Sequence, residues 1–401
     1  MTKRSRSIIA VAFLGQAFAV GTTIGSFPIF LKPVADTFQA SLMQISLGMS
    51  FITLMMGLSG VVVGPLLDRG YFRRIMVTGA CLLASALIAG AQATSLWQLG
   101  ALCIPVGLSI PMLGPLTGGA LVGKTFGPDR GRALGIANMG IPTGGLLFAM
   151  AAGAIVHRVG WRYALIFFGV AIVCVLLPSI AWVIGDPESM RTKAPVQPTS
   201  SEVSPTPGWN RRRLLANRDF WAAALTLGIT AGVGAGWSAH LAHYLMDLGS
   251  SPRSSATWVA VAGGLGMAGA LFFGWLSDRL QPHRALLSVV VIQGAVFVLY
   301  LNQPPLGVAI FGALVVGMCG GGFMPSYTSL IARRFGAASL GLAMGLSNLF
   351  LIPFGMTGPP TAGALRDAFG HYQVGVGVFL IATCLGGMAL VTLRPDPRED
   401  D

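Results

Sequence analysis

The sequence Gly-Pro-Leu-Leu-Asp-Arg-Gly-Tyr-Phe-Arg-Arg at residues 64–74 returns in shortened form as Gly-Trp-Leu-Ser-Asp-Arg at residues 274–279. Each copy lies where a long apolar run ends and a short charged turn begins. The same offset of 210 residues pairs Gly107 with Gly317, Pro115 with Pro325, Gly135 with Gly345, Asn138 with Asn348, and Gly160 with Gly370. One register across both halves predicts an internal duplication. Two parallel membrane halves are typical of carriers in which one half rocks against the other.

The composition predicts a membrane protein. Of 401 residues, 54% are hydrophobic and only 10% are charged, and the mean hydropathy is +0.72, whereas soluble domains carry about 25% charged residues. A spanning helix needs roughly 20 apolar residues. Runs of this length are found at residues 8–31, 42–67, 73–94, 96–123, 131–156, 160–184, 218–246, 254–277, 284–303, 306–332, 340–365 and 372–393. We therefore expect an all-α membrane protein with twelve transmembrane helices in two pseudo-symmetric six-helix bundles.

The predicted bundles cover residues 1–185 and 218–401. Between them, residues 186–217 are rich in Pro, Ser, Thr and Arg, a composition that cannot bury enough apolar surface to fold alone. We interpret this segment as a cytoplasmic linker. The five cysteines are scattered singly through apolar runs, which argues against a disulfide framework or a metal site. No cofactor, metal site or catalytic group is expected.

The distribution of basic residues predicts the topology. The predicted external segments hold five of the 26 Lys and Arg residues, and 21 remain on the side of the two termini. The five are Lys32, Arg158, Arg162, Arg253 and Arg366. This bias places both termini in the cytoplasm of a protein in the cytoplasmic (inner) membrane. The formal charge of +12 thus reflects orientation in the membrane and does not indicate a nucleic-acid partner.

The duplicated turn, the twelve spans and the polar central segment resemble the major facilitator superfamily over essentially the whole chain. The resemblance implies alternating access by a monomer. It also implies that Gly64 and Gly274 allow close helix contacts and that Asp68 and Asp278 face helix starts near residues 339–340 and 130–131. These residues would form a cytoplasmic gate together with Arg69, Arg74, Arg279 and Arg284. A carboxylate near the positive end of a helix is stabilising, which agrees with this assignment.

Two stretches are similar to the monocarboxylate and oxalate–formate carriers within that superfamily. They are residues 25–34 (GSFPIFLKPV) and residues 240–249 (HLAHYLMDLG). Two features depart from the group's pattern. Gly25 stands where animal members carry a substrate-linked Lys, and residues 254–277 hold no charged residue where many members carry an Arg. The cation that would pair with a substrate carboxylate is therefore missing.

The ionisable residues at membrane depth are His240 and His243, because all fourteen carboxylates fall in loops or at run ends. Such residues are functional candidates by default, and histidine titrates near neutral pH. We expect His240, and with it His243, to take part in proton coupling, and His240 to supply positive charge to a substrate carboxylate. The alternative is a neutral histidine that is hydrogen-bonded to a neighbouring helix.

Other polar or aromatic side chains in the apolar runs are candidates for the wall of a central substrate cavity. They are Gln16, Thr22, Thr23, Asn138, Trp237, Tyr327 and Asn348. An interhelical hydrogen bond is the structural alternative for Asn138 and Asn348, and Trp237 fits an apolar wall or gate better than a stacking site.

These features predict a secondary active transporter that moves a small organic anion, of the monocarboxylate class, together with a proton. Its expected partners are that small molecule, protons and the lipid bilayer. The main alternative is a proton-driven exporter of a neutral or apolar compound. A membrane-integral enzyme would need a nucleophile, a metal set or a carboxylate–His pair at membrane depth, and none is visible. A receptor would need an output domain, for which the linker is too short.

Overall fold

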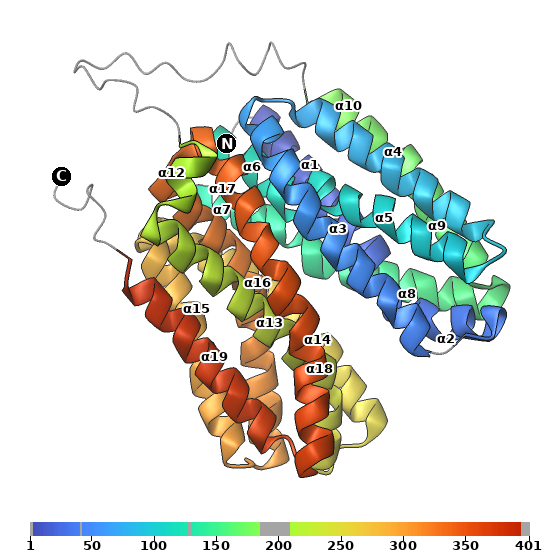
Figure 1. Cartoon of the computed structure of the whole chain (residues 1–401), viewed down its shortest axis with the longest axis vertical. Helices are drawn as coiled ribbons and strands as arrows, with labels where there is room; N and C mark the ends of the chain where they lie inside the picture. Colours follow the sequence, from blue (N-terminus) through green and yellow to red (C-terminus); the bar gives the residue numbers. More distant parts are fainter. Residues whose placement is uncertain (1–2, 41, 127–129, 185–208, 394–401) are drawn as a thin grey trace.

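The computed structural model describes residues 3–40, 42–126, 130–184 and 209–393 (Figure 1). These residues include 12 spans that are long and apolar enough to cross a membrane, and no strand is found among them. This confirms the prediction of an all-α membrane protein with twelve transmembrane helices. Most of the predicted linker, residues 186–217, lies outside the described residues, which resume at residue 209.

Short breaks divide several spans of the N-terminal half. Its elements are α1 (Lys3–Val20), the π-helix η1 (Gly21–Gly25), α2 (Phe27–Phe38), α3 (Leu42–Asp68), α4 (Phe72–Ala91), α5 (Leu96–Leu113), α6 (Pro115–Thr125), α7 (Arg130–Asn138), α8 (Gly140–Val159), α9 (Trp161–Ala171), the π-helix η2 (Ile172–Leu176) and α10 (Leu177–Val183). The first predicted run, residues 8–31, is too short at its end, because the helix resumes after η1 and continues to Phe38.

The C-terminal half has longer unbroken helices. It begins with the short α12 (Arg211–Leu215), followed by α13 (Arg218–Asp247), α14 (Pro252–Arg279), α15 (Pro282–Leu301), α16 (Leu306–Phe335), the 3₁₀-helix η3 (Ala337–Ser339), α17 (Leu340–Ser347), the 3₁₀-helix η4 (Asn348–Phe350), α18 (Leu351–Phe369) and α19 (Gln373–Val391).

The break between α5 and α6 follows from one proline. Pro115 has no N–H, so the carbonyl of Pro111 loses its helical donor. The hydroxyl of Thr117 donates to that carbonyl at 2.7 Å, and the N–H of Gly114 keeps its bond to the Ile110 carbonyl at 2.7 Å. A polar side chain thus satisfies the backbone group that the kink frees, as hydrocarbon surroundings require.

The same pairs of spans pack together in both halves. In the N-terminal half α1 packs on α8, α3 on α5, and α4 on both α5 and α9. In the C-terminal half the equivalent pairs are α13 with α18, α14 with α16, and α15 with α16 and α19. This repetition of contacts is the structural counterpart of the 210-residue offset in the sequence.

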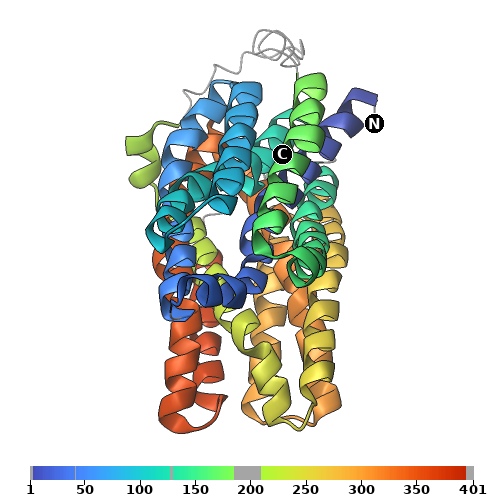
Figure 2. The ribbon, with the colours of Figure 1, turned by 90° about the vertical axis from the view of Figure 1, so that its right-hand side faces the viewer.

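The two halves meet mainly at one end, which we call the linker end because α10 ends there and α12 and α13 begin there. The contacts join α3 to α17 and α14 to α7, and they include α6 and α16. In Figure 1 the halves touch where α6, α7 and α17 lie, and their ribbons diverge toward the ends of α2 and α18. In Figure 2 the N-terminal half, in blue to green, faces the viewer in the upper part of the picture.

Glycines allow the backbones to approach at both of these crossings. A methyl group on Gly64 would overlap the carbonyl oxygen of Gly341, and one on Gly131 would overlap that of Gly274. The reverse is also true, because a Cβ at Gly274 would lie 2.5 Å from the Gly131 oxygen and 2.9 Å from the Cα of Gly135. Small residues at crossings are a general device for joining helices within lipid.

We therefore expect Gly274→Ala to weaken the closed linker end. The added methyl group meets backbone that cannot move aside, and overpacking of this kind costs about 1–3 kcal/mol. The distance between spin labels attached at Thr125 and Leu280, which are both exposed near this end, should shift toward longer values. Gly263→Ala on the same helix is the matched control, because its methyl group would meet nothing within 4 Å. Equal distance distributions in the two variants would contradict the expectation.

Candidate functional site

Asp68, the last residue of α3, caps the first turn of α17 in the other half. Its Oδ1 accepts from the N–H of Gly341 at 2.8 Å and its Oδ2 from the N–H of Leu342 at 2.7 Å. The first amides of a helix lack helical partners, and a carboxylate there is worth up to about 2 kcal/mol when it is partly buried. The Asp68 side chain is only 14% exposed, so this contact joins the halves strongly.

Asp278 makes the equivalent contact from the other direction. Its Oδ1 accepts from the N–H of Gly131 at 2.5 Å and its Oδ2 from the N–H of Arg132 at 2.7 Å, at the start of α7. The two carboxylates thus lie on pseudo-symmetric helix ends, and each binds two backbone amides of the opposite half. The structure places both aspartates beside the helix starts that the resemblance implies.

The sequence analysis missed Lys124, which completes the first of these contacts. Its Nζ lies 2.9 Å from Asp68 Oδ1 and donates to the Leu67 carbonyl at 3.1 Å. Because Lys124 is 19% exposed, the ion pair is poorly screened by water. The equivalent residue 210 positions later is Arg334, which pairs with Asp219 instead, at 2.9 Å. Lys124 directly follows the fourth apolar run. The repeat of a basic residue at positions 124 and 334 could have indicated it from the sequence.

Ser339, at the N-cap of α17, is a second residue that the sequence analysis missed. A serine at this position usually caps its own helix, but Ser339 makes no such bond. Its hydroxyl instead accepts from the backbone N–H of Trp209 at 2.9 Å, and the Trp209 ring packs edge-on against Phe335. The chain just before α12 is therefore attached beside the helix start that Asp68 caps.

The arginines of the duplicated turn lie on the surface. Arg74 stacks over the ring of Tyr71 at 5.6 Å, and Arg279 over that of Trp275 at 5.0 Å. Arg69 and Arg284 are exposed. Their place in a gate remains a prediction.

The polar side chains expected in a central cavity occupy several different environments. Thr22 and Thr23 donate to the carbonyls of Phe18 and Ala19 in their own span. Gln16 is fully buried with no hydrogen-bond partner for its amide, and it packs next to Gly118.

The remaining four candidates are also buried. Asn138 donates to the Leu134 carbonyl of its own helix at 2.9 Å. Asn348 packs against Gly60 at the crossing of the halves. Tyr327 stacks on Phe323, and Trp237 lies among the aromatic rings of Tyr244, Phe297 and Tyr300 inside the C-terminal half. Their contacts do not gather them around one space, and a substrate-binding role for them stays a prediction.

His240 has a partner at each ring nitrogen. Its Nδ1 lies 3.1 Å from the hydroxyl of Tyr372 and its Nε2 lies 3.1 Å from the carbonyl oxygen of Pro359. A carbonyl only accepts, so Nε2 carries a proton. Burial raises the pKa of the Tyr372 hydroxyl, which therefore stays protonated and can donate to Nδ1.

His240 is half-buried, and His243 is exposed with its ring 6.5 Å from that of His240. Position 240 lies about 33 Å along α13 from its start, because each helical residue rises about 1.5 Å. His240 is therefore nearer the end opposite the linker end than the middle of the span. It joins α13 to α18 and to the turn before α19. Tyr372 was missed because it stands at the very start of the twelfth apolar run, where nothing in the sequence indicates that it faces His240.

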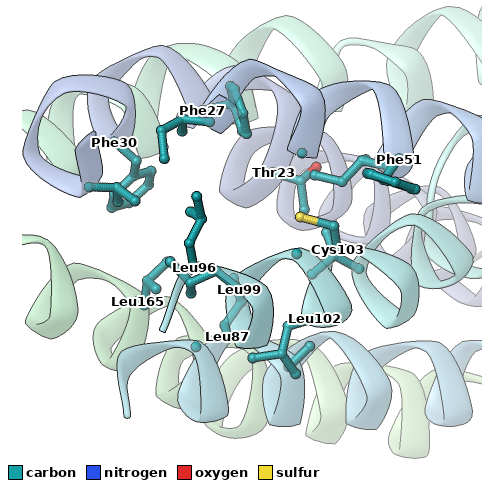
Figure 3. Close-up of a pocket in the computed structure, with 18 of the residues that line it drawn as sticks. Thr23, Phe27, Phe30, Phe51, Leu87, Leu96, Leu99, Leu102, Cys103 and Leu165 are labelled. Carbon is teal, nitrogen blue, oxygen red and sulfur yellow. The ribbon is translucent and has the colours of Figure 1, made fainter. Parts of the chain in front are cut away.

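The first half contains a cavity of about 400 Å³ beneath α2 (Figure 3). Nearly all its lining side chains are apolar, including Phe27, Phe30 and Leu99.

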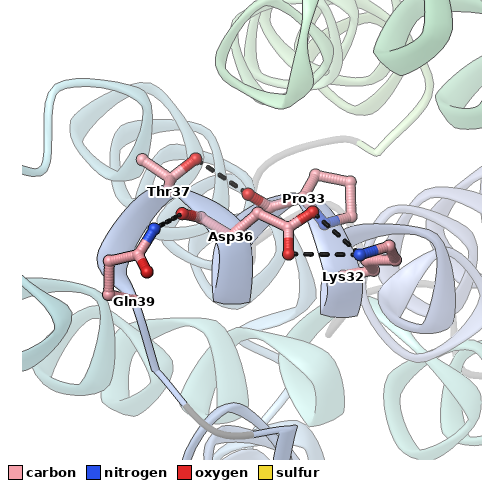
Figure 4. A network of polar contacts seen from close by, with 5 residues as sticks. All are labelled: Lys32, Pro33, Asp36, Thr37 and Gln39. Atoms are coloured by element: carbon pink, nitrogen blue, oxygen red, sulfur yellow. Dashed lines mark hydrogen bonds and ion pairs between the residues drawn. The ribbon is translucent and has the colours of Figure 1, made fainter.

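Lys32 lies on the surface of α2 and forms an exposed ion pair with Asp36 at 3.1 Å, beside the Thr37–Pro33 and Gln39–Asp36 hydrogen bonds (Figure 4). An exposed pair of this kind adds little stability. Within the described residues no cluster of His, Cys, Asp and Glu could hold a metal ion.

Twelve spans in two equivalent halves, closed at one end by reciprocal carboxylate caps, define an integral membrane transporter. The model of the Major Facilitator Superfamily matches residues 12–350, and the chain belongs to this family. Because the family and the relatives named below are transporters, the alternative of a membrane-integral enzyme falls away.

Two relatives illustrate the range of the family. The chain is 26% identical to monocarboxylate transporter 13 of Bos taurus over 398 residues, which is 96% of this chain and 88% of the relative. It is 24% identical to the agnestins efflux protein AgnL12 of Paecilomyces divaricatus over 400 residues, which is 98% and 87% of the two chains. A bacterial homologue of the iron transporter ferroportin, in an outward-facing state with soaked iron, matches with a TM-score of 0.76 at 13% identity, over 98% of this chain and 99% of that one. The last likeness shows the fold alone.

Asp68→Asn should loosen the start of α17. The amide side chain keeps one acceptor but loses the charge, at a cost of about 1–2 kcal/mol, which is a factor of roughly 5–30 in an opening equilibrium. Hydrogen exchange at the Gly341 and Leu342 amides should become faster by that factor. Asp219→Asn is the matched control, because it removes a carboxylate with an ion pair of the same length that caps neither amide. Unchanged exchange in Asp68→Asn would refute the capping role.

Proposed function

We propose that this transporter moves a small organic acid of the monocarboxylate class together with a proton, by alternating access across the cytoplasmic membrane. The observation that carries the proposal is the pair of hydrogen bonds at His240. The relation to a monocarboxylate transporter over nearly the whole chain supports the substrate class.

His240 can bind a proton without losing either partner. In the neutral ring Nε2 donates to Pro359, and Nδ1 accepts from Tyr372. In the protonated ring both nitrogens donate, and the Tyr372 hydroxyl turns from donor to acceptor. The nearby charged groups are Arg366, which lies over the Tyr372 ring, Asp247, 3.4 Å from Arg366, and Asp367, which also acts on the Tyr372 hydroxyl. Protonation therefore adds a positive charge without leaving a buried polar group unpaired.

The gate role that we propose for the duplicated turn connects to this histidine through one span. The eleventh span runs from Ala337 to Phe369. Its first turn is held by Asp68, and its later part carries Pro359, whose carbonyl meets His240. The distance along the span from Gly341 to Pro359 is about 27 Å, at about 1.5 Å per residue. If a change at His240 displaces this span, the displacement would therefore reach the gate.

In the proposed cycle Gly64, Gly274, Asp68 and Asp278 hold the linker end closed. Release of both caps would allow the halves to part at this end and to close at the other. The distribution of basic residues favours a cytoplasmic location for both termini, and in the proposed topology the linker end is the cytoplasmic one.

Export of a neutral or apolar compound is the second candidate. The absence of charged residues from residues 254–277 favours it, and so does the relation to an efflux protein. Uptake of labelled organic acids and of their neutral amides into proteoliposomes, with and without an inward pH gradient, separates the two. Saturable, gradient-driven uptake of an acid supports the first proposal. Transport of the amides alone would replace it with the second.

His240→Gln should abolish the stimulation of acid transport by a pH gradient. Glutamine retains a donor and an acceptor but cannot gain a proton, so the rate of transport should lose its dependence on pH. The measurement is the initial uptake rate as a function of pH. His371→Gln is the matched control, because this exposed histidine is adjacent to Tyr372 in the sequence.

Tyr372→Phe provides an intermediate test. It removes the hydroxyl that faces Nδ1 and leaves the Pro359 bond in place, so the midpoint of the pH profile should move while stimulation persists. A His240→Gln variant with the pH profile of the parent protein would remove this residue from proton coupling.

A further inference from the structure

The cavity of about 400 Å³ lies wholly within the N-terminal half, away from the contacts between the halves. Its lining comes from η1, α2, α3, the end of α4, α5 and the start of α9. Figure 3 shows the labelled side chains of Phe27, Phe30, Leu96, Leu99 and Leu102 around this space. The volume is that of an ordinary small-molecule site, and the lining decides what such a site can hold.

The lining of the cavity offers water very few hydrogen-bonding groups. The hydroxyls of Thr22 and Thr23 are already bonded to carbonyls of their own span. Cys103 contributes a thiol, which is a weak donor. A buried water needs two to four polar partners, and apolar cavities bind hydrocarbon in preference. The cavity therefore suits an aliphatic or aromatic hydrocarbon group that carries no charge.

The length and position of the cavity match one leaflet of a bilayer. Along α5 the lining runs from Leu96 to Val106, which is about 15 Å at 1.5 Å per residue. Half of the hydrocarbon core of a bilayer is also about 15 Å. Trp97 lines the mouth and is 89% exposed, as is typical of tryptophans at the level of the lipid headgroups. Leu47 and Phe51, each 49% exposed, form an open side.

We propose that this cavity binds one acyl chain of a bilayer lipid from the leaflet opposite the linker end. The headgroup lies at the level of Trp97 and Gln44, and the chain descends between α2 and α5 to Val106. The π-helix η1 directs α2 toward α8, where Gly25 packs on Gly145. This leaves the cavity between α2 and α5, which the acyl chain fills. This lipid site is independent of the transported compound.

Gly100 offers a way to fill the cavity. It lines the space, and a Cβ there would meet nothing within 4 Å, so Gly100→Leu occupies the site without disturbing the backbone. Gly307→Leu is the matched control, because Gly307 lies near the start of α16 in the other half and is equally open.

The experiment uses the purified full chain in bilayer nanodiscs with phosphatidylcholine that carries a photoreactive diazirine in mid-chain. Residue-level mapping of the wild type should locate crosslinks at buried lining residues such as Ile52, Leu87 and Val106. These crosslinks should be lost in Gly100→Leu and retained in Gly307→Leu. Wild-type protein that crosslinks only at exposed surface residues such as Trp182, 93% exposed, would overturn the proposal without any variant. So would equal crosslinking in Gly100→Leu, or displacement of the lipid by a transported acid or amide.

Discussion

The pairing of a carboxylate with the first turn of a helix from the opposite half is the interaction on which the closed state depends. Lipid supplies no hydrophobic drive between helices, so their association relies on close packing and polar contacts. Gly64 and Gly274 bring the backbones together, and Asp68 and Asp278 then accept from first-turn amides that lack a helical partner. Without the glycines the carboxylates would fall short of these amides. Without the carboxylates two helix starts would be left without caps.

The two caps are equivalent in geometry but differ in their surroundings, and this difference bears on how they open. Asp68 has the buried Lys124 beside it, and the helix that it caps begins at Ser339, which binds the chain at Trp209. Asp278 binds the start of α7, where the neighbouring cation is Arg130, whose Nε donates to the Phe126 carbonyl at 3.3 Å. The helix start that Asp68 caps is therefore also bonded to the chain between the halves, at Trp209. The described contacts of the Asp278 cap lie within the spans.

Much of this could be predicted from the sequence because hydropathy and the repeat report on strong constraints. Runs of apolar residues gave the spans to within a few residues, except the first, where η1 allows the helix to resume as far as Phe38. The resemblance to the major facilitator superfamily indicated the helix starts that Asp68 and Asp278 face. Lys124 and Tyr372 were missed because one directly follows an apolar run and the other stands at the very start of one. Trp237 packs inside its half because neighbouring rings from α13 and α15 surround it, which periodicity on one helix cannot reveal.

The near absence of charge inside the spans limits the ways in which the transporter can respond to its cargo. A carrier with a fixed buried cation can bind an anion directly, whereas here residues 254–277 offer no such group. In the proposed mechanism, a histidine whose neighbours accept either protonation state provides a positive charge only when a proton is bound, so one proton supplies both the charge and the coupling. That arrangement would suit a weakly held acid with a single carboxylate. A second negative charge would remain without a partner in a low-dielectric site, at a cost of several kcal/mol, so the proposed mechanism would select against dicarboxylates before any steric contact is considered.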